Sequence, residues 1–200
     1  MFISFEGQDG SGKTTQAARL AEWLRSEGNE VVATREPGGT PIGEAIRDVV
    51  LHGFEMTPWA EASLFASARA EHAAQVIRPA LERGAWVVCD RYVDSSIVYQ
   101  GIARGLGVDS VLELNRMVTG GLMPARTFVL ALDVDAARSR QGAYLDRIER
   151  EDEAFRSAVA DGYRELAALF PDRIGIIDAS LDPDEIAEQV REQVRQLESL

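Results

Sequence analysis

The sequence predicts an α/β fold in which a five-stranded parallel sheet lies between helices on both faces, giving three layers. Apolar segments of strand length alternate along the chain with segments of helical pattern, an order typical of parallel sheets. Residues 85–89 form a continuous apolar run, as expected for a strand that is covered on both faces. The 200 residues contain no linker, repeat or low-complexity segment, so we expect a single domain, 1–200.

The first strand, at residues 2–5, leads into a phosphate-binding motif. Residues 7–14 read GQDGSGKT and match G-x-x-x-x-G-K-[ST] at every fixed position, and a helical pattern follows over residues 15–26. The glycines let backbone N–H groups turn inward and wrap a phosphate at the helix N-terminus. We expect Lys13 to reach the β- and γ-phosphates of a nucleotide and the Thr14 hydroxyl to bind Mg²⁺. The motif makes the fold P-loop NTPase-like, and its expected nucleotide-binding residues are Gly7, Gln8, Asp9, Gly10, Ser11, Gly12, Lys13 and Thr14.

Lys13 is the only lysine among the 21 basic residues of the chain. Every other basic residue is an arginine, and a compact ammonium group differs in size and hydrogen-bonding geometry from a planar guanidinium. A single lysine that falls on the lysine position of the motif favours a working phosphate loop over a glycine-rich turn that matches by chance.

The bulk properties exclude several functional classes. A net charge of −12 and a pI near 4.7 argue against nucleic acid as a partner, whereas a nucleotide needs only a local basic pocket. The chain opens into a strand without a basic leader, and no apolar run reaches membrane-spanning length. The single cysteine, Cys89, excludes an intrachain disulfide and is expected to be a buried, inert thiol. We therefore expect a cytoplasmic protein, and we interpret His52 and His72 as incidental because they are not spaced as a metal pair.

Two segments follow the first helix and are candidates for ligand contacts. A strand near residues 30–33 ends in the loop 34–40, which contains Pro37 and two glycines. Ligands bind at such strand ends, but this loop alone slightly favours an ordinary turn. A helix is expected at residues 41–51, and a long, alanine-rich helical stretch at 58–83 carries Phe65 and Arg69 on one face. Such a helix is deeply buried or pairs with another subunit; the simplest interpretations are a core Phe65 and an ion-paired or solvated Arg69.

The apolar strand at 85–89 ends in polar residues suited to phosphate chemistry. Asp90 at its tip is well placed to hold Mg²⁺ or its water shell, and Arg91 beside it suits a phosphate. If a helix begins soon after, its polar side chains project toward this tip; they are Ser95, Ser96, Tyr99 and Gln100.

The second half of the chain continues the alternation of helices and strands. Helices are expected at residues 108–118 and 151–169 and from 182 to about 197, with strands at 127–132 and 174–177. Between them lies the arginine-dense segment 136–150, which holds Arg138, Arg140, Arg147 and Arg150 around Gly142. Such a run is usually a solvated face, but in an acidic chain it is also a candidate lid over phosphates.

Several motifs, in order, resemble bacterial thymidylate kinase over residues 2 to about 163. They are FEGQDGSGKTTQ, TREPGGT, the helix with Phe65 and Arg69, DRYVDSSIVYQG followed by ARGL, and LDRIE. The resemblance implies a homodimeric enzyme that transfers the γ-phosphoryl group of ATP to dTMP in the presence of Mg²⁺, giving dTDP and ADP. It implies Thr14 and Asp90 as metal-binding residues, partly through water.

The resemblance also implies roles for the acceptor-site residues. Phe65 would stack on thymine, Arg69 would hydrogen-bond the base, and Tyr99 would lie under the deoxyribose and crowd a 2′-OH. Arg91 would bind the acceptor phosphate. The full set that it implies for dTMP is Glu36, Pro37, Arg47, Phe65, Arg69, Arg91, Ser95, Ser96, Tyr99 and Gln100.

The implied catalytic residues are Lys13, Asp9, Arg91, Arg140 and Arg147. Some family members carry an arginine inside the P-loop, but this chain has Gly10 there, so the charge between donor and acceptor must come from the lid. The lid departs from the arginine-rich run of the related type, since the arginine nearest the lid tip falls near Gly142. The choice among the lid arginines therefore stays open, with Arg140 and Arg147 favoured.

Three alternatives remain. The nearest is another nucleoside or nucleotide kinase with a different acceptor, such as dUMP or a deoxynucleoside. A regulatory GTPase or ATPase switch is disfavoured because a chain whose only lysine is Lys13 has no Asn-Lys-x-Asp guanine-reading motif. A non-catalytic nucleotide-binding module is disfavoured because Lys13, Thr14, Asp90 and Arg91 are all present.

Overall fold

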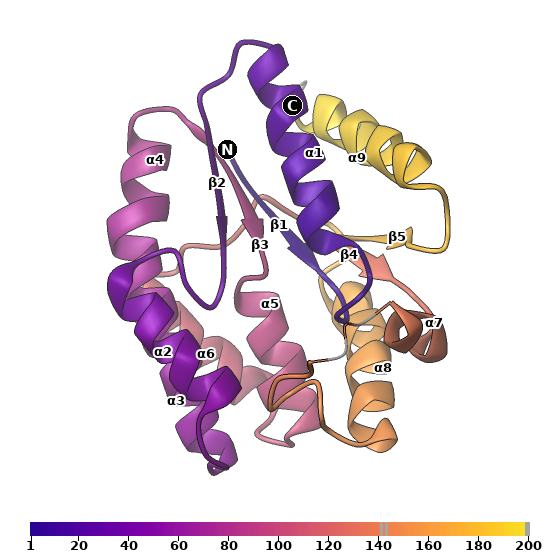
Figure 1. Cartoon of the computed structure of the whole chain (residues 1–200). Helices are drawn as coiled ribbons and strands as arrows, with labels where there is room; N and C mark the ends of the chain where they lie inside the picture. Colours follow the sequence, from indigo (N-terminus) through magenta and orange to yellow (C-terminus); the bar gives the residue numbers. More distant parts are fainter. Residues whose placement is uncertain (141, 143, 199–200) are drawn as a thin grey trace.

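The computed structural model describes residues 1–140, 142 and 144–198. Positions 141 and 143 of the expected lid, and positions 199–200 of the expected domain, lie outside the described residues. Within the described part of the chain, five parallel strands form one sheet in the order β2-β3-β1-β4-β5, with helices on both faces (Figure 1). The expected fold class is confirmed.

The element bounds agree with the sequence expectations to within a few residues at most ends. The strands are β1 (Phe2–Glu6), β2 (Val31–Arg35), β3 (Trp86–Asp90), β4 (Arg126–Ala131) and β5 (Ile174–Asp178). The helical segments are α1 (Lys13–Ser26), α2 (Pro41–His52), α3 (Pro58–His72), η1 (Ala73–Ile77), α4 (Arg78–Glu82), α5 (Val93–Ser96), η2 (Ile97–Ala103), α6 (Val108–Thr119), α7 (Val134–Ser139), α8 (Glu153–Leu169) and α9 (Pro183–Glu198).

Local chemistry explains where α2 begins and why the stretch after α3 is not a regular α-helix. Thr40 caps α2, because its hydroxyl accepts a hydrogen bond from the Gly43 amide at 3.0 Å. The stretch expected as one helix at 58–83 instead passes through the π-helical segment η1, which precedes Pro79. A proline has no N–H to continue the regular i→i−4 ladder, so the backbone adopts the wider turn just before it.

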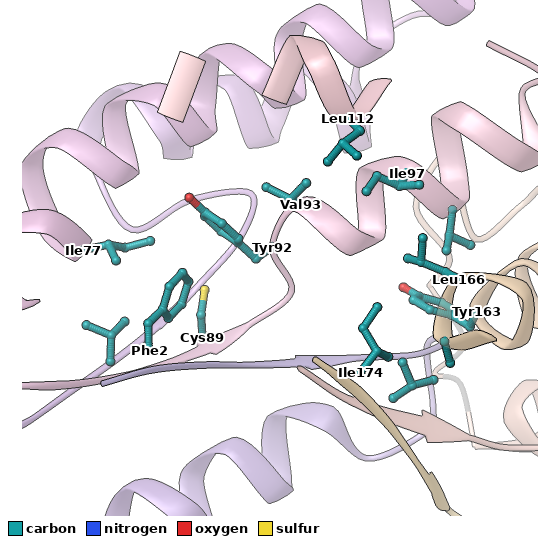
Figure 2. Packing of buried hydrophobic residues seen from close by; sticks show 14 of the residues in the cluster. Phe2, Ile77, Cys89, Tyr92, Val93, Ile97, Leu112, Tyr163, Leu166 and Ile174 are labelled. Atoms are coloured by element: carbon teal, nitrogen blue, oxygen red, sulfur yellow. The ribbon is translucent and has the colours of Figure 1, made fainter. Parts of the chain in front are cut away.

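Alternate residues of the strands build two cores, one on each face of the sheet. Ile3 and Phe5 of β1 pack with α1, α7 and α9, whereas Phe2 of β1 packs with α4, α5, η2, α6 and α8. The strand β3 alternates in the same way, with Val88 in the first core and Val87 and Cys89 in the second. Figure 2 shows the second core, with Phe2, Cys89 and Tyr92 packed between the sheet and the helices that cover it. Cys89 is fully buried, and burial raises the pKa of its thiol well above the ordinary value, as expected for an inert cysteine.

The register of the sheet brings three loops to one place. Phe5 of β1 and Arg35 of β2 both pair with Asp90 of β3, so these three neighbouring strands end at the same level. Two backbone hydrogen bonds continue the ladders, from the Arg91 amide to the Phe5 carbonyl and from the Glu36 amide to the Asp90 carbonyl, each 2.9 Å long. The P-loop, the segment after β2 and the segment after β3 therefore meet at the carboxyl edge of the sheet, the usual ligand site of this architecture.

Candidate active site

The P-loop takes a backbone path that requires glycine. Gly7, Gly10 and Gly12 have φ angles of 135°, 86° and 92°, in the left-handed region that other residues rarely adopt. A Cβ atom at Gly10 would lie 2.4 Å from the Ala137 carbonyl oxygen of α7, so the loop and α7 are in close contact. A P-loop arginine at this position is therefore excluded by space as well as by sequence.

Lys13 and Thr14 place their polar groups beside the tip of β3. Lys13 is buried, and its Nζ donates to the Gln8 carbonyl at 2.8 Å; burial and the neighbouring Arg91 charge lower the pKa of its ammonium. The Thr14 hydroxyl donates to Asp90 Oδ2 at 2.5 Å. Asp90 Oδ1 is buried and has no partner among the residues that the structure describes. A hydroxyl next to an unpartnered carboxylate oxygen is a donor set suited to Mg²⁺.

Arg91 stands at the centre of the site in a left-handed backbone conformation, with φ of 69°. Its guanidinium donates to Asp9 Oδ1 at 2.6 Å and to the Ser95 hydroxyl at 3.0 Å. Burial alone would raise the pKa of Asp9, but the charges of Arg91 and Lys13 lower it below its ordinary value. Asp9 is therefore an ionised carboxylate that holds the arginine in place.

Glu6, at the end of β1, was not identified from the sequence as a site residue. It is fully buried and accepts hydrogen bonds from the Tyr92 amide at 2.7 Å, the Ser95 hydroxyl at 2.5 Å and the Tyr163 hydroxyl at 3.1 Å. Burial and the nearby Asp94 carboxylate raise the pKa of Glu6 to about 7. The signal was present in the sequence, since a carboxylate directly before a P-loop ends an otherwise apolar strand.

One cavity, with about 570 Å³ of empty space and open to solvent, lies beside Arg91. All of the residues expected for the acceptor line it, namely Glu36, Pro37, Arg47, Phe65, Arg69, Arg91, Ser95, Ser96, Tyr99 and Gln100. Its wall also includes Leu51, Asp146 and Ile148, which were not assigned a role from the sequence. The last two belong to the LDRIE motif, so the motif was found but its position against the cavity was not. We refer to this space as the acceptor cavity.

The far end of the acceptor cavity is held by buried polar groups. Arg69 is buried and donates to Glu36 Oε2 at 2.7 Å, so of the simple interpretations the ion-paired one holds. His72 is also fully buried; its Nδ1 lies 2.9 Å from Glu36 Oε1 and its Nε2 lies 2.7 Å from the Thr34 hydroxyl. The expectation that His72 is incidental is wrong, because its ring fixes Glu36, which in turn fixes Arg69.

A second cavity lies on the P-loop side of Arg91. It is lined by Gly10, Gly12, Lys13, Thr14 and Asp90, with Arg35 and Arg140 on its walls. Asp9, Glu36, Arg47 and Arg91 line both cavities, so the two spaces meet at these residues. A donor phosphate on the P-loop and an acceptor phosphate at Arg91 would face each other across this shared wall.

The expected lid arginines occupy different environments. Arg140 ends α7, lines the P-loop cavity and donates to the Ala179 carbonyl at 3.3 Å. Arg147 is buried and donates to Glu61 Oε2 at 2.7 Å and to the Val50 carbonyl at 2.9 Å, and it lines neither cavity. The Arg147 guanidinium is therefore engaged in a buried ion pair, and its catalytic role stays a prediction. Arg138 and Arg150 are exposed, as Arg140 is, but they line neither cavity.

Two kinds of feature are absent from the part of the chain that the structure describes. None of the described helices is long and apolar enough to cross a membrane. The described residues contain no cluster of three or more His, Cys, Asp or Glu side chains that could hold a metal ion by themselves.

The fold and this arrangement of cavities define a P-loop phosphotransferase whose acceptor is a small phosphorylated molecule. Basic side chains line both cavities, and the acceptor cavity is also lined by the aromatic ring of Phe65 and by the buried Arg69.

Comparisons with known proteins identify the particular family. The Thymidylate kinase family model matches residues 5–190. A thymidylate kinase of Symbiobacterium thermophilum is 48% identical over 200 residues, covering 98% of this chain and 94% of the relative. One of a Synechococcus species is 50% identical over 192 residues, covering 95% and 93%. The crystal structure of thymidylate kinase from Ehrlichia chaffeensis superposes with a TM-score of 0.82 at 34% identity and covers 98% of each chain. The chain belongs to the thymidylate kinase family.

Proposed function

We propose the residue roles below for transfer of the γ-phosphoryl group of ATP to dTMP, giving dTDP and ADP, the reaction that family membership indicates for this chain. The observation that carries the proposal is the shared wall of the two cavities, where Arg91 faces both the P-loop and the acceptor cavity. ATP places its phosphates on the P-loop backbone and on Lys13. dTMP places its phosphate on Arg91 and its base at the far end.

Phosphoryl transfer needs positioning and charge neutralisation more than covalent help from the protein. Lys13 neutralises charge on the β- and γ-phosphates, and Thr14 with Asp90 would hold Mg²⁺, which supplies further positive charge when bound. Arg91 orients the acceptor, and Asp9 orients Arg91 through the 2.6 Å contact. A general base is unnecessary because the attacking oxygen belongs to a phosphate that is already anionic.

The acceptor cavity supports a pyrimidine deoxynucleotide as the second substrate. Phe65 lines it and offers a ring face for stacking on the base, while Arg69 and Gln100 line the polar end. Tyr99 lies close to Arg91, whose guanidinium carbon is 5.4 Å from the ring centre. An aromatic ring therefore lies next to the expected phosphate site, and the family resemblance implies that the deoxyribose lies on this ring, where a 2′-OH would be crowded.

A substrate panel tests the proposal. We expect ADP release from ATP·Mg²⁺ to be fastest with dTMP, weaker with dUMP and negligible with dCMP or thymidine, in an assay that couples ADP to NADH oxidation. Lys13→Met is the matched control for contaminating kinases and should remove the signal. A faster reaction with thymidine than with dTMP would contradict the role of Arg91 as the phosphate ligand, and would favour a deoxynucleoside kinase.

We also propose that the enzyme works as a cytoplasmic homodimer. The exposed side of α3 carries small residues, with exposed Trp59 at its start, and exposed Ile42 and Val49 lie on the neighbouring helix α2. Apolar residues flanking a surface of small side chains suit close helix packing between subunits. Sedimentation velocity should give the mass of a dimer, and Trp59→Glu should shift it toward the monomer; a monomeric wild type would contradict the proposal.

A further inference from the structure

Glu61, in the first turn of α3, lies buried behind the acceptor cavity. It is only 1% exposed and does not line the cavity itself. Its carboxylate accepts from Gln100 Nε2 at 2.9 Å, from Arg104 Nη2 at 3.1 Å and from Arg147 Nη2 at 2.7 Å. One buried acidic group therefore joins α3, η2 and the LDRIE segment.

The charge state of Glu61 fixes the orientation of the Gln100 amide. Burial alone would raise the pKa of Glu61, but the hydrogen bonds from Arg104, Gln100 and Arg147 lower it below its ordinary value. An ionised carboxylate can only accept hydrogen bonds, so Gln100 must turn its NH₂ group toward Glu61. Because Gln100 also lines the acceptor cavity, the carbonyl oxygen Oε1 is the amide atom left for a ligand.

Arg69 presents the opposite polarity in the same cavity. Its guanidinium donates to the Glu36 carboxylate, the Ser96 hydroxyl, the Asn115 side chain and the Tyr92 carbonyl. A guanidinium has five N–H groups, so these four contacts leave one for a ligand. The lining of the acceptor cavity thus combines an acceptor on Gln100 with a donor on Arg69, which contacts Ser96, four residues before Gln100.

That combination matches one kind of base edge. Thymine and uracil carry an N–H at position 3 next to a carbonyl at position 4, so their edge donates to Gln100 and accepts from Arg69. Cytosine carries an unprotonated nitrogen at position 3 and an amino group at position 4, so it would place acceptor against acceptor and donor against donor. A mismatch of this kind leaves buried polar groups unpaired, which is a strong basis for discrimination.

We propose that Glu61 is a specificity-determining positioning residue, which holds the Gln100 amide with its carbonyl toward the base so that the site accepts an imide edge and rejects cytosine. This inference rests on the proposed binding of a pyrimidine base at the far end of the acceptor cavity. Glu61 would thus influence which base is bound without contacting the substrate.

The test compares the Kd of dTMP with the Kd of dCMP by isothermal titration calorimetry on the folded protein. In Glu61→Gln the neutral amide no longer dictates which end of Gln100 turns inward, so the ratio of the dCMP Kd to the dTMP Kd should fall by about tenfold or more. Arg104→Met is the matched control, because it removes another partner of Glu61 without freeing the amide, and it should keep the wild-type ratio within about twofold. Equal changes in the two variants would overturn the inference.

A second variant tests the same claim without disturbing the ion pairs. Gln100→Met removes the acceptor, so dTMP should bind about tenfold more weakly while dCMP binding is unchanged or stronger. Loss of dCMP affinity instead would show that Gln100 turns its NH₂ group inward, which would overturn the proposal. In the Gln100→Met background, Glu61→Gln should no longer change the ratio, whereas a merely structural effect would persist. A wild-type protein that does not prefer dTMP to dCMP would instead contradict the proposed base site.

Discussion

The Glu6 carboxylate accepts a hydrogen bond from the Tyr92 backbone amide at 2.7 Å, directly after the left-handed residue Arg91. The Arg91 amide itself donates to the Phe5 carbonyl at 2.9 Å, so β1 holds the backbone on both sides of this residue. A non-glycine residue in such a conformation costs about 1–3 kcal/mol and persists only where its surroundings fix it. The end of β1 therefore both begins the P-loop and aims the arginine expected to bind the acceptor phosphate.

Removing the Glu6 side chain should change the position of the Arg91 guanidinium while leaving the arginine itself in place. In Glu6→Ala, the Tyr92 amide and the Tyr163 hydroxyl lose a buried acceptor, so we expect a lower melting temperature and a kcat/KM for dTMP reduced by about tenfold or more. Glu6→Gln keeps one acceptor oxygen for the Tyr92 amide and should retain most activity. A folded Glu6→Ala enzyme with wild-type kcat/KM would show that Arg91 is positioned by other contacts.

Glu6 should also make stability depend on pH. Its pKa rises from about 4.5 in an unfolded chain to about 7 in the fold, so between these values the folded state binds more protons than the unfolded state. The free energy of unfolding should therefore fall as the pH rises from about 4.5 to 7, by about 3 kcal/mol from this group.

Urea unfolding at several pH values between 4.5 and 8 measures this contribution. We expect Glu6→Gln to remove it and to flatten the profile relative to the wild type. Glu22→Gln is a matched control for the loss of one negative charge, because Glu22 is exposed. Parallel profiles for the wild type and Glu6→Gln would show that burial of Glu6 carries no such cost.

The variant Lys13→Arg should lose ATP affinity and turnover, although it keeps the positive charge. The Lys13 ammonium is buried and donates to the Gln8 carbonyl at 2.8 Å, and a larger planar guanidinium does not reproduce the geometry of this compact group. We expect ATP affinity to fall by at least about tenfold and turnover to be mostly lost, close to the values for Lys13→Met. Near-wild-type turnover in Lys13→Arg would show that the loop does not distinguish an ammonium from a guanidinium.

Phe65 serves both packing and substrate binding. It packs with Val50, Leu51 and Ile148 in a small core and also lines the acceptor cavity. Phe65→Ala should therefore lower the melting temperature and weaken dTMP binding by about 1–3 kcal/mol, with ATP affinity unchanged. Phe65→Leu should restore much of the melting temperature but not the dTMP affinity. If Phe65→Ala weakens ATP binding as much as dTMP binding, Phe65 acts only as a core residue and does not stack on the base.

The sequence predicted those parts of the fold and site that depend on local order. The alternation of strands, loops and helices can be recognised in the sequence. Asp90 and Arg91 come at the end of an apolar strand, so the topology of a parallel sheet places them at its carboxyl edge. Partnerships between distant segments were not predictable. In the sequence nothing distinguishes Arg147 from the other lid arginines, but in the structure it forms an ion pair with Glu61. In the same way, no residue near His72 in the sequence indicates its partners, Thr34 and Glu36, which lie at the end of β2. Both side chains are buried, and their hydrogen bonds fix the carboxylates of Glu61 and Glu36.

The lid arginines give the sharpest division between catalytic and structural roles. Arg140 lines the P-loop cavity together with Lys13 and Arg91, and α7 packs against Gly10 closely enough to exclude a side chain there. We therefore propose that Arg140 contacts the charge that develops between the donor and acceptor phosphates. The loss of a comparable arginine from other phosphoryl-transfer enzymes costs about 10³–10⁵ in turnover.

We therefore expect Arg140→Ala to lower kcat by up to about 10³-fold while dTMP affinity stays nearly unchanged, the pattern of an interaction made mainly in the transition state. Arg138→Ala and Arg150→Ala are matched controls and should turn over normally, because these exposed side chains, unlike that of Arg140, line neither cavity. Arg147→Met should lower the melting temperature by uncoupling the buried Glu61 pair, with kcat reduced far less than in Arg140→Ala. The measurements are kcat, KM and melting temperature for the four variants. If Arg140→Ala turns over normally while Arg147→Met loses kcat at an unchanged melting temperature, the lid must rearrange during turnover, and the catalytic assignment would pass from Arg140 to Arg147.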